Sequence, residues 1–245
     1  MSAGSLGPVR LLSIQHPKAD QAGTFALAAR EAGHIYDEWC PGVGQAAPGD
    51  PAGYDGILVL GGEQNVLDAP RLRYLQDEIA LIGAALERRQ PLLGVCLGAQ
   101  LLVAAAGGEV VRVSEPEIGW YEVQRLPEGA ADPLFGALPE RFSSYCWHSY
   151  GVELPEEALL LARSAVSIHG FRLGDSAWGV QFHPEATREI LLGWFASYRD
   201  DPDAVAMGFD PQVAEAELGD RLAAWEGLGR RLFGAFTAAA ADRVA

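Results

Sequence analysis

The chain has 245 residues, enough for one large domain with a sizeable core. Its 33 acidic and 18 basic side chains give a formal net charge of −15, which argues against nucleic acid and anionic membranes as partners. No apolar run reaches the roughly 18 residues that suggest a membrane span. The opening residues also lack the charged start and apolar run of a signal peptide, so the expected location is cytoplasmic.

Short apolar runs alternate with helical patterns along the first half of the chain. Runs bounded by turn residues predict strands, and apolar positions repeating every three or four residues predict helices. This alternation is typical of parallel βαβ units in an open sheet with helices on both faces. Strands are predicted over 9–14, 35–39, 56–60 and 92–95, helices over 23–32, 72–88 and 98–106, and a Gly/Pro-rich loop over 41–53.

The pattern changes between residues 109 and 182. Short apolar runs separated by Pro, Gly and Asp turns predict an antiparallel portion, and hence a mixed, largely parallel sheet in an α/β fold. The predicted strands there are 110–113, 121–124, 142–147, 159–163, 167–173 and 177–182, and a helix follows over 187–198.

The end of the chain differs in composition from the rest. Residues 200–210 are polar with Pro and Gly, which predicts a linker, and residues 213–241 are rich in Ala, Leu and Glu, which predicts one or two helices. We therefore expect a domain over 1–198 and a linker with a C-terminal helical extension over 199–245. The extension either packs on the domain or forms a homo-oligomer or partner interface.

The segment Pro91-Leu-Leu-Gly-Val-Cys96-Leu-Gly-Ala-Gln100 places a cysteine between a buried strand and a helix. The glycines leave room for a sharp turn of the kind that exposes a nucleophile above the sheet. A helix N-terminus beside Cys96 favours its thiolate. Alternatively, the cysteine is a small apolar residue that fills a buried turn. The chain has three cysteines, too few to form a disulfide framework in a protein of this length.

A second segment, Gln181-Phe-His183-Pro-Glu185, follows the last predicted strand. Proline after His183 favours an extended backbone, in which residues two apart point to the same side. His183 and Glu185 can therefore stand side by side, with the carboxylate orienting the imidazole and the other ring nitrogen facing Cys96. Alone, the segment could equally be an exposed turn.

Together the two segments resemble the class I, triad-type glutamine amidotransferases, whose hallmarks are Gly-x-Cys-x-Gly-x-Gln and Gln-Phe-His-Pro-Glu. The resemblance implies a flavodoxin-like fold and hydrolysis of the glutamine side-chain amide. It also implies a triad of Cys96 as nucleophile, His183 as base and Glu185 as the residue that orients the base.

Two further segments fit this family. Gly61-Gly62-Glu63 resembles its oxyanion loop, although Glu63 stands where proline is usual, and the resemblance implies an oxyanion hole from the N–H groups of Gly62 and Leu97. Trp147-His-Ser149-Tyr150-Gly resembles a segment whose backbone holds glutamine, although Tyr150 stands where some members have Asp. By this resemblance Gln100, Ser149 and Tyr150 line the substrate pocket.

Glu117-Ile-Gly-Trp120 and Phe171-Arg-Leu-Gly174 resemble stand-alone members similar to the amidotransferase domain of GMP synthase. The chain holds no synthase domain, so a partner synthase is expected to accept the ammonia. Two alternatives remain open. One is a γ-glutamyl amide or peptide hydrolase with the same triad, and the other is a non-catalytic regulatory or binding subunit. No cofactor is expected, and the five histidines show no ligand-spaced cluster that would indicate a metal.

Overall fold

The computed structural model describes residues 7–16, 22–47 and 50–243 of the chain. The outermost residues of both expected domains, and part of the expected loop over 41–53, lie outside the described residues. The strands are β1 (Arg10–Ile14), β2 (Ile35–Trp39), β3 (Gly56–Val59), β4 (Leu92–Val95), β5 (Glu109–Arg125), β6 (Arg141–Glu153), β7 (Leu159–Arg163), β8 (Ile168–Leu173) and β9 (Ala177–Val180). The α-helices are α1 (Gly23–Glu31), α2 (Arg73–Glu87), α3 (Leu97–Ala105), α4 (Pro127–Ala130), α5 (Arg188–Ser197), α6 (Pro202–Ala206) and α7 (Pro211–Asp242).

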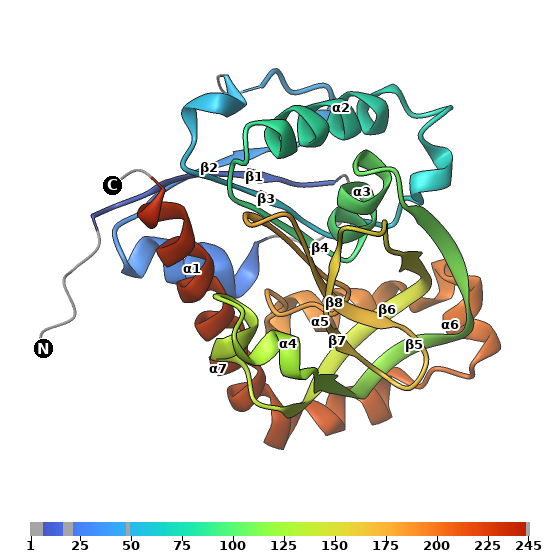
Figure 1. The fold of residues 1–245 in the computed structure, drawn as a ribbon. Helices are drawn as coiled ribbons and strands as arrows, with labels where there is room; N and C mark the ends of the chain where they lie inside the picture. The colour runs from blue at the N-terminus through green and yellow to red at the C-terminus, as the bar shows by residue number, and fades with distance from the viewer. Residues whose placement is uncertain (1–6, 17–21, 48–49, 244–245) are drawn as a thin grey trace, which may run out of the picture.

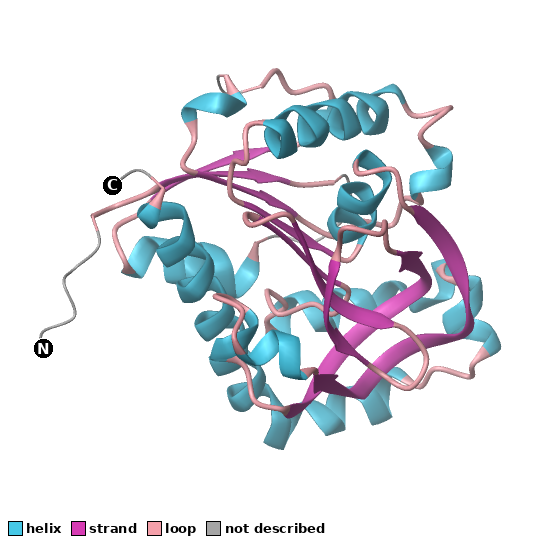
Figure 2. Cartoon of the chain, viewed as in Figure 1, coloured by secondary structure: helices cyan, strands magenta, loops and turns pink. Residues whose placement is uncertain are grey.

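One mixed sheet runs through the molecule in the order β2-β1-β3-β4-β9-β8-β7-β5-β6. The strands from β2 to β9 pair in parallel, and the strands from β9 to β6 pair antiparallel. Figure 2 shows this sheet with helices around it. The predicted α/β fold with an open, mixed sheet is confirmed. The parallel half carries the strand-to-helix crossovers, and its carboxyl edge is where such sheets bind ligands.

Helices cover both faces of the parallel half, as the apolar strand sequences require (Figure 1). Helices α1, α5 and α7 supply one buried apolar cluster, and α2 and α3 supply the other. Phe25 of α1 stacks on Phe233 of α7 with ring centroids 5.2 Å apart. The apolar face of the long C-terminal helix is thus part of the core.

Two strands of the antiparallel half, β5 and β6, are longer than predicted, whereas β7 has its predicted bounds. Residues 110–113 and 121–124 belong to a single strand, β5, which pairs with β6 along most of its length at the sheet edge. The register shifts between Arg112 and Glu117, which accommodates Pro116 because proline cannot donate a ladder hydrogen bond. The predicted break between two strands is therefore a bulge.

The segment predicted as a linker contains the helix α6. Asp201 accepts hydrogen bonds from the backbone of Asp203 and Ala204, and Pro202 occupies the first helical position. The following segment is one helix, α7, capped by Asp210. The domain boundary near residue 198 and an oligomer interface on the extension stay predictions. Within the described ranges, no helix is both long and apolar enough to cross a membrane.

Candidate active site

Cys96 is the single residue between the end of β4 and the start of α3. Its backbone has φ 51° and ψ −108°, a conformation that costs a non-glycine residue about 1–3 kcal/mol. The chain holds this turn because the Cys96 N–H donates to the Val180 carbonyl of the neighbouring strand at 2.8 Å. Strain of this kind at a reactive side chain is typical of a nucleophile elbow.

The glycines around Cys96 are required by close packing. A Cβ atom on Gly98 would lie 1.9 Å from the Val59 carbonyl oxygen, and one on Gly94 would lie 2.6 Å from the Gly98 backbone. The first turn of α3 therefore presses directly on β3 and β4. This contact fixes the position of Cys96 relative to the loop that follows β3.

His183 and Glu185 follow β9, the strand next to β4, and both are buried. His183 Nδ1 and Glu185 Oε1 are 2.8 Å apart, and the His183 ring is also hydrogen-bonded to Cys96. Burial alone would lower the pKa of His183, but the charges of Glu185 and Cys96 outweigh burial and raise it well above its ordinary value. The structure therefore joins the three predicted residues in one hydrogen-bonded line.

The ring of Trp194, on α5, meets the His183 ring edge-to-face with centroids 4.7 Å apart. The His183 backbone N–H donates to the Tyr145 carbonyl at 3.1 Å. These contacts, with the Glu185 carboxylate, restrict rotation of the imidazole. The His183 ring is thus held in place from three directions.

The loop after β3 lies beside the elbow. A Cβ on Gly62 would approach the Leu97 side chain to 2.8 Å, and both residues line the same cavity. His16 Nδ1 is 2.9 Å from the Gly61 carbonyl oxygen, and His16 Nε2 is 2.9 Å from Glu78 Oε2. Because the Gly61 carbonyl and the Gly62 N–H belong to one peptide unit and point in opposite directions, this bond fixes the direction of the Gly62 N–H.

The sequence analysis missed His16 and Glu78. Both side chains are completely buried, His16 just after β1 and Glu78 on α2. A glutamate inside the apolar stripe of a predicted helix was the available signal, because a buried carboxylate needs a partner. The sequence could not show which histidine that partner was.

The predicted substrate residues surround the elbow. Gln100 donates to the Tyr150 carbonyl at 3.0 Å and to Gln181 Oε1 at 3.3 Å, and Gln181 donates to Cys96 Sγ at 3.4 Å. Gln181 is a further missed residue, since it contacts the sulfur directly. The Ser149 hydroxyl donates to Asp203 of α6, so the C-terminal segment reaches this site.

A cavity of about 800 Å³ opens beside Cys96 and is lined by Gly62, Leu97, Gln100 and His183. Its walls also include aromatic and acidic side chains, and no lysine or arginine is among the described residues that line it. The aromatic residues are Trp147, Tyr150, Trp194 and Tyr198, and the acidic residues are Glu63, Glu189, Asp200, Asp201 and Asp203.

Residues 45–190 match the family model described as glutamine amidotransferase class-I. The chain belongs to the class I glutamine amidotransferase family. This match includes Cys96, His183 and Glu185 and the loop at Gly62.

Similarities to individual proteins agree with this assignment. A solved glutamine amidotransferase from Thermotoga maritima superposes with a TM-score of 0.85 at 26% identity, over 94% of this chain and 98% of that one. GMP synthase from Aeropyrum pernix is 35% identical over 71% of this chain, which spans only 34% of that enzyme. A γ-glutamyl-L-1-hydroxyisopropylamide hydrolase from a Pseudomonas species is 34% identical over 61% of this chain and 54% of its own length.

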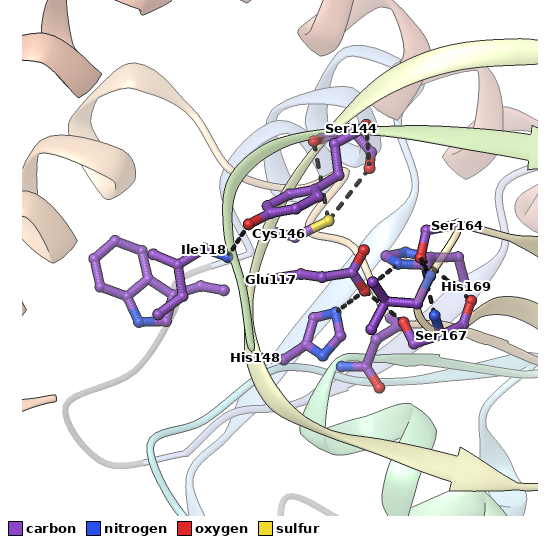
Figure 3. A network of polar contacts seen from close by, with 12 residues as sticks. Glu117, Ile118, Ser144, Cys146, His148, Ser164, Ser167 and His169 are labelled. Carbon is purple, nitrogen blue, oxygen red and sulfur yellow. Dashed lines mark hydrogen bonds and ion pairs between the residues drawn. The ribbon is translucent and has the colours of Figure 1, made fainter. Parts of the chain in front are cut away.

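This class I glutamine amidotransferase contains a second group of cysteine, histidine and carboxylate, formed by Glu117, Cys146, His148 and His169 (Figure 3). Cys146 is completely buried and does not line the cavity, and burial raises the pKa of its thiol well above the ordinary value. A substrate cannot reach this sulfur, and its thiolate is disfavoured. This group therefore lacks what a nucleophile needs. Cys96 keeps 6% of its surface exposed, and its neighbours Leu97 and His183 line the cavity.

Proposed function

We propose that this protein hydrolyses the side-chain amide of glutamine through a Cys96–His183–Glu185 triad. The observation that carries the proposal is the continuous hydrogen-bonded line from Cys96 through His183 to Glu185, with the cysteine on a strained elbow directly before Leu97, which lines the cavity. Membership of the class I glutamine amidotransferases agrees with it. The same line argues against a non-catalytic subunit, since such a role does not require a strained nucleophile.

In the proposed reaction the Cys96 thiolate attacks the amide carbon, and the carbonyl oxygen becomes an oxyanion. The N–H groups of Gly62 and Leu97 stabilise that oxyanion, and His16 orients the Gly62 peptide. The His183 imidazolium gives its proton to the leaving ammonia, and the carbon–nitrogen bond breaks to leave a γ-glutamyl thioester. His183 then takes a proton from water, which hydrolyses the thioester and releases glutamate.

The ammonia is proposed to pass to a partner synthase. GMP synthase joins a related segment to further residues in one chain, and this chain spans 34% of that enzyme. Residues 199–245 form the proposed extension, which contributes Asp201 and Asp203 to the cavity wall. A partner that binds there would lie next to the released ammonia.

A second candidate substrate is a γ-glutamyl amide with a cationic amine. The cavity, at about 800 Å³, has five acidic side chains and four aromatic rings on its walls, a combination that attracts cations. Arg112 already forms an ion pair with Asp203. The carboxylates of Glu63, Glu189 and Asp200 are therefore the groups that would attract a cationic amine. The similarity to a γ-glutamyl amide hydrolase supports this candidate.

Ammonia release from glutamine tests the proposal, with Cys96→Ser and Cys146→Ser as a matched pair. We expect Cys96→Ser to abolish release and to lose labelling by a glutamine-analogue electrophile, whereas Cys146→Ser keeps the nucleophile and is still labelled. Unchanged release in folded Cys96→Ser protein would refute the triad.

A substrate panel separates the two candidates. It compares glutamine with γ-glutamyl amides whose amines carry a positive, neutral or negative charge. If the second candidate is right, kcat/KM is highest for the cationic amide, and the substitution Glu189→Gln removes this preference. Equal kcat/KM for the three amides, below that for glutamine, would leave glutamine as the substrate.

A further inference from the structure

Four side chains with metal-ligand atoms meet beneath the cavity floor, on three different strands. Glu117 on β5 lies directly opposite His148 on β6, and Cys146 lies two residues before His148 on the same face of that strand. His169 reaches the group from β8. Figure 3 shows the Glu117 carboxylate with His148 on one side and His169 and Ser167 on the other.

The distances in this group are close to those of a metal site. Glu117 Oε2 is 2.9 Å from His169 Nε2 and 3.2 Å from His148 Nε2. Ligands bound at about 2.0 Å in a tetrahedron are about 3.3 Å apart, so these pairs need almost no movement. Ligand atoms from Cys146, His148 and His169 lie within 4.8 Å of one another. Glu117 is not part of that group, so its carboxylate has to move toward the ion for all four side chains to bind it.

Three buried polar atoms of this group make no hydrogen bond within the described part of the chain. His148 Nδ1 is 3.1 Å from the Tyr150 carbonyl, so that nitrogen carries the hydrogen and Nε2 presents a lone pair toward Glu117. His148 Nε2, His169 Nδ1 and Glu117 Oε1 are buried and make no hydrogen bond with any described residue. Buried polar atoms are normally paired, and three unpaired ones in one group require an explanation.

We propose that Glu117, Cys146, His148 and His169 form a binding site for a zinc-like divalent metal ion. A thiolate, two imidazoles and a carboxylate are the ligands that zinc prefers, and they do not suit magnesium or calcium. One thiolate and one carboxylate also balance the two positive charges, so the buried site is neutral. The bond from His148 to the Tyr150 carbonyl is the kind of contact that orients a metal-bound imidazole.

The position of the site indicates a structural role. The Glu117, Cys146 and His169 side chains are completely buried, so no open coordination position faces the substrate. His148 lines the cavity, which provides an entry path for the ion. The metal would tie β5, β6 and β8 together and fix the Tyr150 carbonyl, to which Gln100 also donates. It would thus hold one wall of the substrate pocket in place.

Metal analysis of the whole chain, purified with zinc and freed of any affinity tag, tests this site. We expect one zinc ion per chain in the parent protein and in Cys96→Ser, and loss of zinc in Cys146→Ser. Replacement of zinc by cobalt(II) should add a thiolate-to-cobalt charge-transfer band that is absent from Cys146→Ser. In His169→Gln cobalt should bind more weakly by at least about tenfold.

Other results of these experiments would contradict the proposed metal site. Loss of the metal in Cys96→Ser but not in Cys146→Ser would place the ion at the triad and overturn the proposal. A cobalt spectrum without a thiolate band, or no retained metal, would also overturn it. Zinc should raise the thermal midpoint of the parent but not of Cys146→Ser, because a ligand stabilises only the folded state that binds it. An equal rise in both would also contradict the site.

Discussion

The substitution Glu185→Gln removes the negative charge beside His183 and keeps the size of the side chain. Glu185 is completely buried, and its Oε1 lies 2.8 Å from His183 Nδ1. A carboxylate this close raises the pKa of an imidazole by about 1–3 units. That equals about 1.4–4 kcal/mol, so kcat should fall about 10- to 1000-fold.

The pH dependence of the activity shows in which direction the substitution moves the pKa of His183. In the parent protein the pKa of His183 is raised, so the imidazolium that protonates the leaving ammonia persists above pH 6.5. Activity should decline only as pH rises through that raised pKa. In Glu185→Gln the decline should move to lower pH, because the charge that raised the pKa is gone.

The assay is ammonia release from saturating glutamine across a pH series, with Glu189→Gln as the matched control. Glu189 also lines the cavity but is exposed, whereas Glu185 is buried beside His183, so the kcat of Glu189→Gln with glutamine should stay close to that of the parent. An alkaline decline at the same pH in Glu185→Gln and the parent would refute the role of Glu185. So would an equal loss of kcat in both variants.

Four further predictions concern the scaffold. His16→Gln should lower kcat by up to about 100- to 1000-fold through loss of one oxyanion donor, and steady-state kinetics should show KM nearly unchanged. His16→Asn, whose amide reaches the Nδ1 position next to Gly61, should retain more activity. Gly98→Ala should destabilise the fold by about 3 kcal/mol in urea titrations, because its Cβ meets a β3 carbonyl at 1.9 Å. Gly234→Ala on α7 meets nothing within 4 Å and should stabilise the helix by up to about 1 kcal/mol. A chain that ends at Arg199 should lose its cooperative thermal transition by circular dichroism, because α7 supplies core side chains.

The fold class, and the meeting of Cys96, His183 and Glu185, were predictable because their signals are local. Each parallel strand is a short apolar run beside a helical pattern, and the elbow and the His-Pro-Glu segment each lie within ten residues. Their meeting follows from topology, since β4 and β9 are neighbours and both end at the same edge of the sheet. The rules of strand connection leave few other topologies in which a sequence with these segments in this order brings them together.

Other features depended on side chains that are distant in sequence. His16 and Glu78 are 62 positions apart, and Glu117 and His169 are 52 apart, so no spacing motif connects them. The bulge in β5 and the short helix α6 were missed because strand pairing and capping outweighed the proline and glycine signals.

The sequence by itself determined the α/β fold, the class I family motifs and the residue types of the triad, because these depend on local periodicity and on short segments. Only the tertiary structure decided which buried carboxylate meets which imidazole, how the C-terminal helices reach the cavity, and that Glu117, Cys146, His148 and His169 converge. Such contacts depend on how distant strands register and curve, and that information is not contained in any single segment.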